Sequence, residues 1–209
     1  MQCTTRYVTI ELPATLIPFV NLTFPVANID LYESLASTIK SLDITAQVGT
    51  VVSYSSSVLI DRSSIHVTNG GIRGRFNLLE SLDLSTFAGS LAVSVTTETL
   101  NFTSPKGVLD TYAGDGPMKV ALLAPLKHRT QITSHHAPRA AGMVIMYPRE
   151  WEGIVEATTE SGLVTMKGEG LEFVESRPMY KKAFKGDNFE KKGTVDISNS
   201  AGPITFILL

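Results

Sequence analysis

The stretch Val195-Asp-Ile-Ser-Asn-Ser-Ala-Gly-Pro-Ile-Thr-Phe-Ile-Leu208 decides how the fold of this chain is interpreted. Alternating apolar positions at Val195 and Ile197 lead into small polar residues and Gly202, and a second alternating run begins at Ile204. Alternation with a period of two is typical of a half-buried strand, and Gly beside small polar residues is typical of a tight turn. The stretch therefore predicts a strand, a turn and a second strand.

Related stretches occur upstream, at residues 58–76, 82–95, 108–122, 130–146 and 154–166. Their turn glycines recur at unequal intervals, of the size that marks stacked supersecondary units; these are Gly70, Gly89, Gly116, Gly162 and Gly202. One strand–turn–strand unit cannot bury its apolar face alone, whereas a stack of units shares one continuous apolar interior. We therefore expect an all-β fold, a parallel β-solenoid. The alternative is a β-sandwich, which also has short strands and turn signals.

The expected organisation is one β-solenoid domain over residues 29–209, preceded by an extension or cap over residues 1–28 and interrupted by a long loop near residues 175–193. A first strand is expected at residues 7–12, where polar and apolar residues alternate.

The segment 29–45 is ambiguous, because Leu31, Leu35, Ile39 and Leu42 also have helical spacing. We favour strands there, since everything downstream is β-like, and we expect a connector at residues 49–57.

Composition excludes some classes of function. Lys and Arg number 18 and Asp and Glu number 20, so no strong charge draws the chain to nucleic acid. No apolar run approaches the roughly 20 residues of a spanning helix. The apolar candidate for a signal peptide, residues 8–20, is interrupted by Glu11, Pro13 and Pro18. The compartment therefore stays open: the chain is cytoplasmic, or secreted if a leader is missing. The single cysteine, Cys3, excludes an internal disulfide.

Four of the turns resemble those of a known family. Val67-Thr-Asn-Gly-Gly-Ile72, Ala113-Gly-Asp-Gly-Pro-Met118, Thr158-Thr-Glu-Ser-Gly-Leu163 and Ser198-Asn-Ser-Ala-Gly-Pro-Ile204 resemble the Thr-Ser-Asn-Gly-x-Ile turns of adhesin-like β-solenoid domains, especially their uncharacterised fungal relatives. Tyr147-Pro-Arg-Glu-Trp-Glu-Gly153 resembles a lead-in segment of the same proteins. The resemblance covers residues 29–209. It implies a right-handed parallel β-solenoid, no established enzymatic activity, and a surface or adhesive role by analogy. It supplies no catalytic residues, and the chain departs from it at His135-His-Ala-Pro-Arg139.

Two groups of side chains could carry chemistry. His128, His135 and His136 are close in sequence, but adjacent strand residues point to opposite faces, so we expect a solvated turn and no metal site or cofactor. An acidic stretch surrounds Trp151, and paired carboxylates beside an aromatic ring could cleave a glycan. Its members are Glu150, Glu152, Glu156, Glu160, Glu169, Glu172 and Glu175. A solvated outer face is the expected role of these carboxylates.

A basic run follows, interleaved with Tyr180, Phe184 and Phe189: Arg177, Lys181, Lys182, Lys185, Lys191 and Lys192. Such a pattern can bind anions, but a loop lying against the acidic stretch is the expectation. Two triplets, at Asn21 and Asn101, are glycosylation acceptors if the chain is secreted.

The expected function is a non-enzymatic binding or structural module whose partner is a glycan or a protein surface; the alternative is a polysaccharide-active enzyme on the same scaffold. Residues 204–209 are expected to form the last coil, which would expose an unpaired edge. The segment at residues 8–12, or a second molecule, is expected to cover an end of the stack, so self-association through an end is a further expectation.

Overall fold

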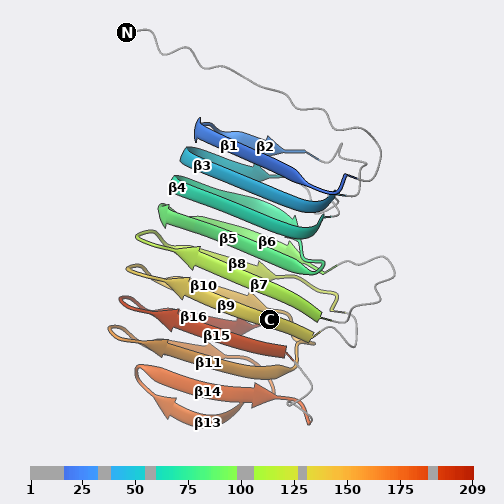
Figure 1. Ribbon diagram of the computed structural model, residues 1–209. Coiled ribbons are helices and arrows are strands. Elements are labelled where there is room, and N and C mark those ends of the chain that lie inside the picture. The colour runs from blue at the N-terminus through green and yellow to red at the C-terminus, as the bar shows by residue number, and fades with distance from the viewer. Residues whose placement is uncertain (1–16, 33–38, 55–59, 98–105, 127–130, 188–192) are drawn as a thin grey trace.

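A computed structural model of the chain describes residues 17–32, 39–54, 60–97, 106–126, 131–187 and 193–209 (Figure 1). The fold is all-β, as expected, and no helix occurs within these ranges. They therefore also contain no helix long and apolar enough to cross a membrane.

The strands lie in the levels of a stack, and most levels contain one strand on each of two opposite sides (Figure 1). One side of the stack, called face A, consists of β1 (Val20–Val26), β5 (Ser81–Ala88), β7 (Lys106–Ala113), β9 (Gln131–Pro138), β15 (Gly193–Asn199) and β11 (Gly153–Thr159). The other side, face B, consists of β2 (Ile29–Leu31), β6 (Leu91–Thr96), β8 (Met118–Leu122), β10 (Met143–Tyr147), β16 (Ile204–Leu208) and β12 (Val164–Lys167). The long strands β3 (Ile39–Ser53) and β4 (Ile60–Asn77) run along both faces, because each turns a corner at its middle. The hydrogen-bonded path passes along face B, through β4 and back along face A, so the sheet nearly closes around one interior.

The level made by β15 and β16 is out of sequence order. On face A, β15 pairs with β9 on one side and with β11 on the other. On face B, β16 likewise lies between β10 and β12. Residues 193–209 are therefore inserted between two levels that precede them in the chain. The expectation that residues 204–209 form the last coil is wrong, because alternation defines a strand's inward face but not its neighbours.

The expected long loop near residues 175–193 is also corrected, since residues 172–185 form a hairpin. β13 (Glu172–Arg177) pairs antiparallel with β14 (Tyr180–Lys185), and β14 pairs antiparallel with β11. Only two residues join the two strands of this hairpin, and so short a connection permits only antiparallel pairing. All other strand pairs of the described ranges are parallel, which disagrees with an antiparallel sandwich.

In the ambiguous segment 29–45, residues 29–31 form β2 and residues 39–45 begin β3, while residues 33–38 lie outside the described residues. The connector expected at residues 49–57 is wrong up to Ser53, because β3 continues through Gly49 and pairs with β4 on both faces. The strand expected at residues 7–12 lies outside the described residues, and so does the cap that would depend on it.

Glycines are stacked at the corners between the two faces. Gly70 has φ +146°, and a Cβ there would overlap the carbonyl oxygen of Gly49 one level above. A Cβ on Gly89 would likewise overlap the carbonyl oxygen of Gly70. Glycine is therefore required for two reasons, since the backbone is in a region that L side chains avoid and the neighbouring level leaves no room for a side chain.

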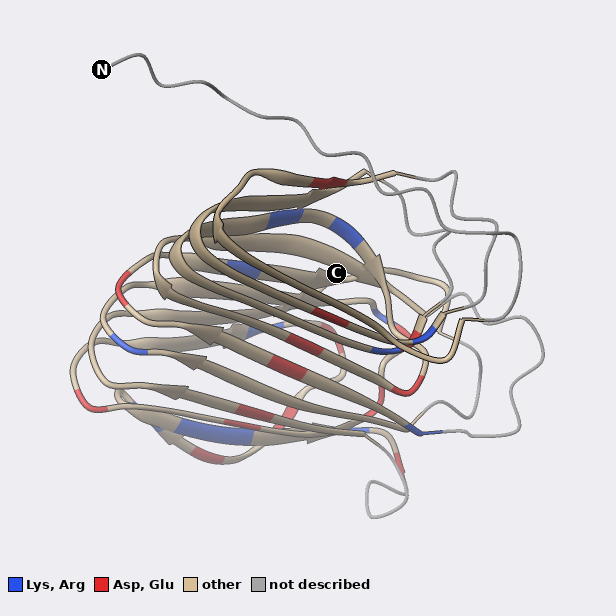
Figure 2. Cartoon of the chain, turned by 45° about the horizontal axis from the view of Figure 1, so that its top comes forward, with Lys and Arg blue, Asp and Glu red and all other residues tan. Residues whose placement is uncertain are grey.

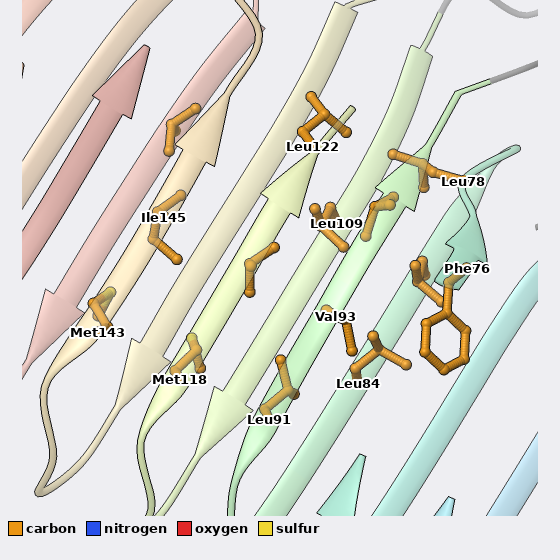
Figure 3. Packing of buried hydrophobic residues seen from close by; sticks show 14 of the residues in the cluster. Phe76, Leu78, Leu84, Leu91, Val93, Leu109, Met118, Leu122, Met143 and Ile145 are labelled. Carbon is orange, nitrogen blue, oxygen red and sulfur yellow. The ribbon is translucent and has the colours of Figure 1, made fainter. Parts of the chain in front are cut away.

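The interior is filled by the inward residues of every level, including Leu84, Leu91, Leu109, Met118 and Ile145 (Figure 3). Each strand alternates between buried and exposed positions, so every level adds apolar side chains to the same column. Burial of such side chains, at roughly 25 cal/mol per Å² of apolar surface, is the main force that holds the levels together.

An aromatic cluster lies in this column near the start of β11. Trp151 is buried, with its ring centroid 5.5 Å from that of Tyr147 and 6.2 Å from that of Phe206. A Cβ on Gly153 would lie 2.8 Å from the Trp151 ring, and one on Gly193 would lie 3.0 Å from its indole nitrogen. The two glycines thus make the space that the indole fills.

Candidate functional site

A shallow trough of about 410 Å³ crosses face A next to the corners of four levels. It is lined by Tyr112, Ala137, Pro138, Arg139, Thr158, Glu160, Ser198, Asn199 and Ser200. We call this hollow the corner trough. Its residues come from β7, β9, β15 and β11 and from the turns that follow the last three of these strands.

The floor of the corner trough consists of outward-facing residues in register. Tyr112 is paired with Ala137 between β7 and β9, and Ser198 is paired with Thr158 between β15 and β11. Ala137, Ser198 and Thr158 are small, so the surface is hollow beside the Tyr112 ring, which is 37% exposed. The trough therefore has one aromatic wall, and its floor is made of small residues, of which Ser198 and Thr158 carry hydroxyls.

The rim carries one charge of each sign, because exposed Arg139 follows β9 and exposed Glu160 follows β11. Backbone hydrogen bonds continue through these turns from level to level. Arg139 N donates to Ala113 O at 2.8 Å, Ala201 N donates to Arg139 O at 3.0 Å, and Glu160 N donates to Asn199 O at 3.1 Å. The rim residues therefore sit on backbone that is fixed from both sides.

Asn199, the Asn of the last turn, holds the corner from inside. Its buried amide nitrogen donates to Ala141 O at 2.9 Å and to Gly202 O at 3.1 Å, while its side-chain oxygen accepts from Ala201 N at 3.1 Å. The turn motif noticed in the sequence thus serves to build the corner, and the adjacent outward residues line the trough.

A column of charged residues runs beside the trough on face A, two positions before each floor residue. Asp110 pairs in register with His135, His135 with Asp196, Asp196 with Glu156, and Glu156 with Lys182. Two contacts link members of this column: Lys182 Nζ forms an ion pair with Glu156 Oε2 at 3.0 Å, and His135 Nδ1 lies 3.4 Å from Asp196 Oδ2. The hydrogen bond from Lys182 holds the pKa of Glu156 below its ordinary value.

The same column continues away from the trough as carboxylates that have like-charged neighbours. Asp110 pairs with Asp83, and Asp43 lies beyond Asp83 with Ser64 between them. Acidic positions on successive strands are visible in Figure 2. Partial burial raises the pKa of Asp83 above its ordinary value, and the charges of Asp110 and Asp43 raise it further, while His66 opposes them.

A buried polar chain crosses the interior below this face. His136 Nδ1 lies 2.7 Å from Thr111 Oγ1, His136 Nε2 lies 3.3 Å from Tyr147 OH, and Tyr147 OH donates to Ser134 Oγ at 2.6 Å. Burial lowers the pKa of His136 to about 3 and raises that of Tyr147. All four side chains are buried, so this chain of hydroxyl and imidazole groups supports the core and cannot reach a substrate.

The structure confirms that His135 and His136 point to opposite faces of β9, and His128 lies outside the described residues. The described ranges contain no cluster of three His, Cys, Asp or Glu residues that could hold a metal ion. The turn that was expected at residues 135–139 is instead formed by residues 139–142, because His135 to Pro138 belong to β9.

The acidic stretch does not surround an accessible aromatic ring, because Trp151 is only 2% exposed. Its carboxylates are distributed over different partners: Glu156 bonds Tyr180 and Lys182, Glu169 lies 2.7 Å from Arg149, and Glu175 lies next to Arg177. The side chains of the basic run also have separate partners. Its described members lie on or beside the β13–β14 hairpin against β11, as the charge complementarity predicts, and Lys191, Lys192 and Phe189 lie outside the described residues.

Comparisons with protein-family models, curated proteins and solved structures found no match to this chain. Tyr112 and Arg139, the main features of the corner trough, were not singled out from the sequence. Their only signal there is position, since both fall at or just after the end of an alternating strand. Such positions become a site only when the stacking order of the strands is known.

Proposed function

We propose that the chain is a β-solenoid binding module that takes a glycan into the corner trough. The solenoid interpretation is supported by parallel, in-register pairing at successive levels around one interior, and by the glycines stacked at the corners. An adhesive role agrees with a binding surface that is spread over several levels.

The observation that carries the proposed function is the lining of the trough. The face of a tyrosine ring packs against the C–H face of a sugar, and charged groups and hydroxyls form directional hydrogen bonds with sugar hydroxyls. Tyr112 supplies the ring, Arg139 supplies donors, Glu160 supplies acceptors, and Ser198 supplies a hydroxyl. Most of the lining is apolar, with a few polar groups at its edges, and the trough is shallow. A sugar has both a C–H face and hydroxyls and suits such a mixed surface, whereas a wholly apolar ligand would need a deeper enclosure.

A polysaccharide-active enzyme is the second candidate, and the proximity of the carboxylates of Glu156 and Asp196 to the trough favours it. Hydrolysis of a glycoside needs two carboxyl groups on opposite sides of the bond, about 5–9.5 Å apart. Glu160 is the carboxylate that lines the trough, while Glu156 is bonded to Lys182 and Tyr180. This arrangement favours binding over cleavage.

The proposal is tested by titrating the full chain with a panel of neutral, acidic and amino-sugar oligosaccharides in calorimetry. We expect Tyr112→Ala to lower the affinity for the bound sugar about tenfold, the equivalent of one lost ring contact. Phe87→Ala is the matched control, because Phe87 is an exposed aromatic residue of β5 that does not line the trough.

Binding to no member of the panel would refute the proposed function. Equal losses in Tyr112→Ala and Phe87→Ala would refute the trough as the site. Release of shortened or unsaturated products from a bound sugar would establish the enzyme instead.

A further inference from the structure

A second tyrosine extends the line of the corner trough. Tyr180 of β14 pairs in register with Thr158 of β11, which places it at the same outward position on the next strand. This line of residues crosses the neighbouring strands β7, β9, β15, β11 and β14. It consists, in that order, of Tyr112, Ala137, Ser198, Thr158 and Tyr180. Four strand spacings separate the two tyrosines, a distance of about 19 Å.

Tyr180 is held by its neighbours on β11 and β14. Its hydroxyl donates to Glu156 Oε1 at 2.9 Å, and the other oxygen of the same carboxylate lies 3.0 Å from Lys182 Nζ. A hydrogen bond to a carboxylate that is itself paired limits the rotation of the phenol ring. The second ring is therefore oriented before any ligand binds.

We propose that the row from Tyr112 to Tyr180 binds an extended, neutral, β-linked glycan that runs across the strands, with one sugar ring on each tyrosine. This inference rests on the proposed function and adds the class and direction of the ligand. A β-1,4-linked pyranose chain in its extended form advances by nearly one strand spacing per ring, so rings between the tyrosines pass over Ala137, Ser198 and Thr158. These residues are small enough to leave the path open.

The charges beside this row favour a neutral chain. Glu156 lies 3.0 Å from Lys182, so this carboxylate next to the floor is compensated, and Asp196 lies 3.4 Å from the His135 ring. Asp110 and Glu160 add negative charge at two further points along the row. A polyanionic glycan would be repelled there, while a polycation would meet Lys182 and Arg139.

A chain-length series of neutral β-linked oligosaccharides tests the inference with the full chain. For a hexasaccharide, which reaches both tyrosines, we expect Tyr180→Ala and Tyr112→Ala each to lower the affinity about fivefold to tenfold. For a disaccharide, which reaches only one, we expect Tyr112→Ala alone to matter. Tyr180→Phe keeps the ring and is expected to retain most of the hexasaccharide affinity.

Ser198→Tyr is a second test, because a bulky side chain at the exposed middle of the row would obstruct a ligand that runs from Tyr112 to Tyr180. The near-ultraviolet spectrum and the unfolding midpoint of each variant show whether it is folded. If Tyr180→Ala and Ser198→Tyr are folded and keep the hexasaccharide affinity while Tyr112→Ala loses it, the extended site is refuted and the proposed function stands. If the wild-type chain binds no neutral glycan but binds an acidic or basic one, the ligand class is refuted.

Discussion

His136 is a single residue whose burial makes the fold sensitive to acid. Its pKa is lowered to about 3 in the folded chain, below the ordinary value of 6.5, because the interior disfavours the charged ring. The folded state therefore keeps His136 neutral while the unfolded state takes up a proton as the pH falls below about 6.5. Stability is complete above this pH and decreases from there down to about pH 3.

We expect protonation of His136 in the unfolded state to lower the unfolding free energy by about 1.4 kcal/mol for each unit by which the pH falls between pH 6 and pH 4. Denaturant titrations at several pH values measure the slope. His136→Gln cannot take up the proton and should flatten the slope by that amount, although it lowers stability at pH 7 by breaking the contacts with Thr111 and Tyr147. An unchanged slope in His136→Gln would contradict the assignment.

Gly70 makes a second prediction at the scale of one residue. Gly70→Ala combines a φ of +146° with overlap on the Gly49 carbonyl, so we expect a loss of about 3 kcal/mol or more in unfolding free energy. Gly142→Ala is the control, because a Cβ there meets the Pro203 ring at 3.3 Å, which can move slightly. Chemical denaturation followed by circular dichroism compares the two; equal losses would show that the corner glycines are not stacked as described.

At the scale of the element, the β13–β14 hairpin protects an end of the stack. Its outer strand, β13, is exposed, carries Glu172, Glu175 and Arg177, and has an irregular register between Phe173 and Glu175. Charges and bulges on an edge strand discourage pairing with another molecule. The two exposed apolar residues of β13, Phe173 and Val174, would otherwise favour association.

Replacing the charges of this edge should cause association. We expect Glu175→Val combined with Arg177→Val to form larger species as the concentration rises, measured by light scattering after size exclusion. The control is Glu160→Val combined with Arg139→Val, which removes the same pair of charges from the corner trough and leaves the edge intact. A double variant of β13 that forms no larger species than the wild-type chain at the same concentration would show that the hairpin has no protective role.

The elements themselves were largely predictable from the sequence, and their order was not. Alternation located most of the strands from residue 60 onward, and Gly70, Gly89, Gly162 and Gly202 marked corners correctly. The hairpin at residues 172–185 was missed, because its residues are mostly exposed and lack the apolar alternation on which the prediction relied. The trough was missed because Tyr112, Ser198 and Thr158 are distant in sequence, and only the stacking order brings them together.

At the scale of the whole molecule, the level formed by β15 and β16 ties the levels on both of its sides together. Phe206 is fully buried, and its ring lies 5.6 Å from that of Tyr147 one level away. Removing it leaves a cavity between levels that the rigid sheet cannot fill.

We expect Phe206→Ala to lower the unfolding free energy by about 3–5 kcal/mol. The emission of Trp151, the single tryptophan of the chain, reports this transition because its ring centroid is 6.2 Å from that of Phe206. Phe87→Ala, which removes a ring that is 48% exposed, should cost much less. Similar losses in the two variants would contradict the described packing.

The insertion of residues 193–209 between levels that precede them also has a consequence during protein synthesis. As the nascent chain leaves the ribosome, residues 153–167 emerge well before the strands that will separate them from residues 131–147. They cannot dock permanently on the finished part of the stack, because that place belongs to residues not yet translated. Assembly on this side of the molecule must therefore wait until residues 193–209 are made, or any earlier pairing must open to admit them. A pause in translation after residue 167 would prolong the interval in which residues 153–167 can pair directly with residues 131–147.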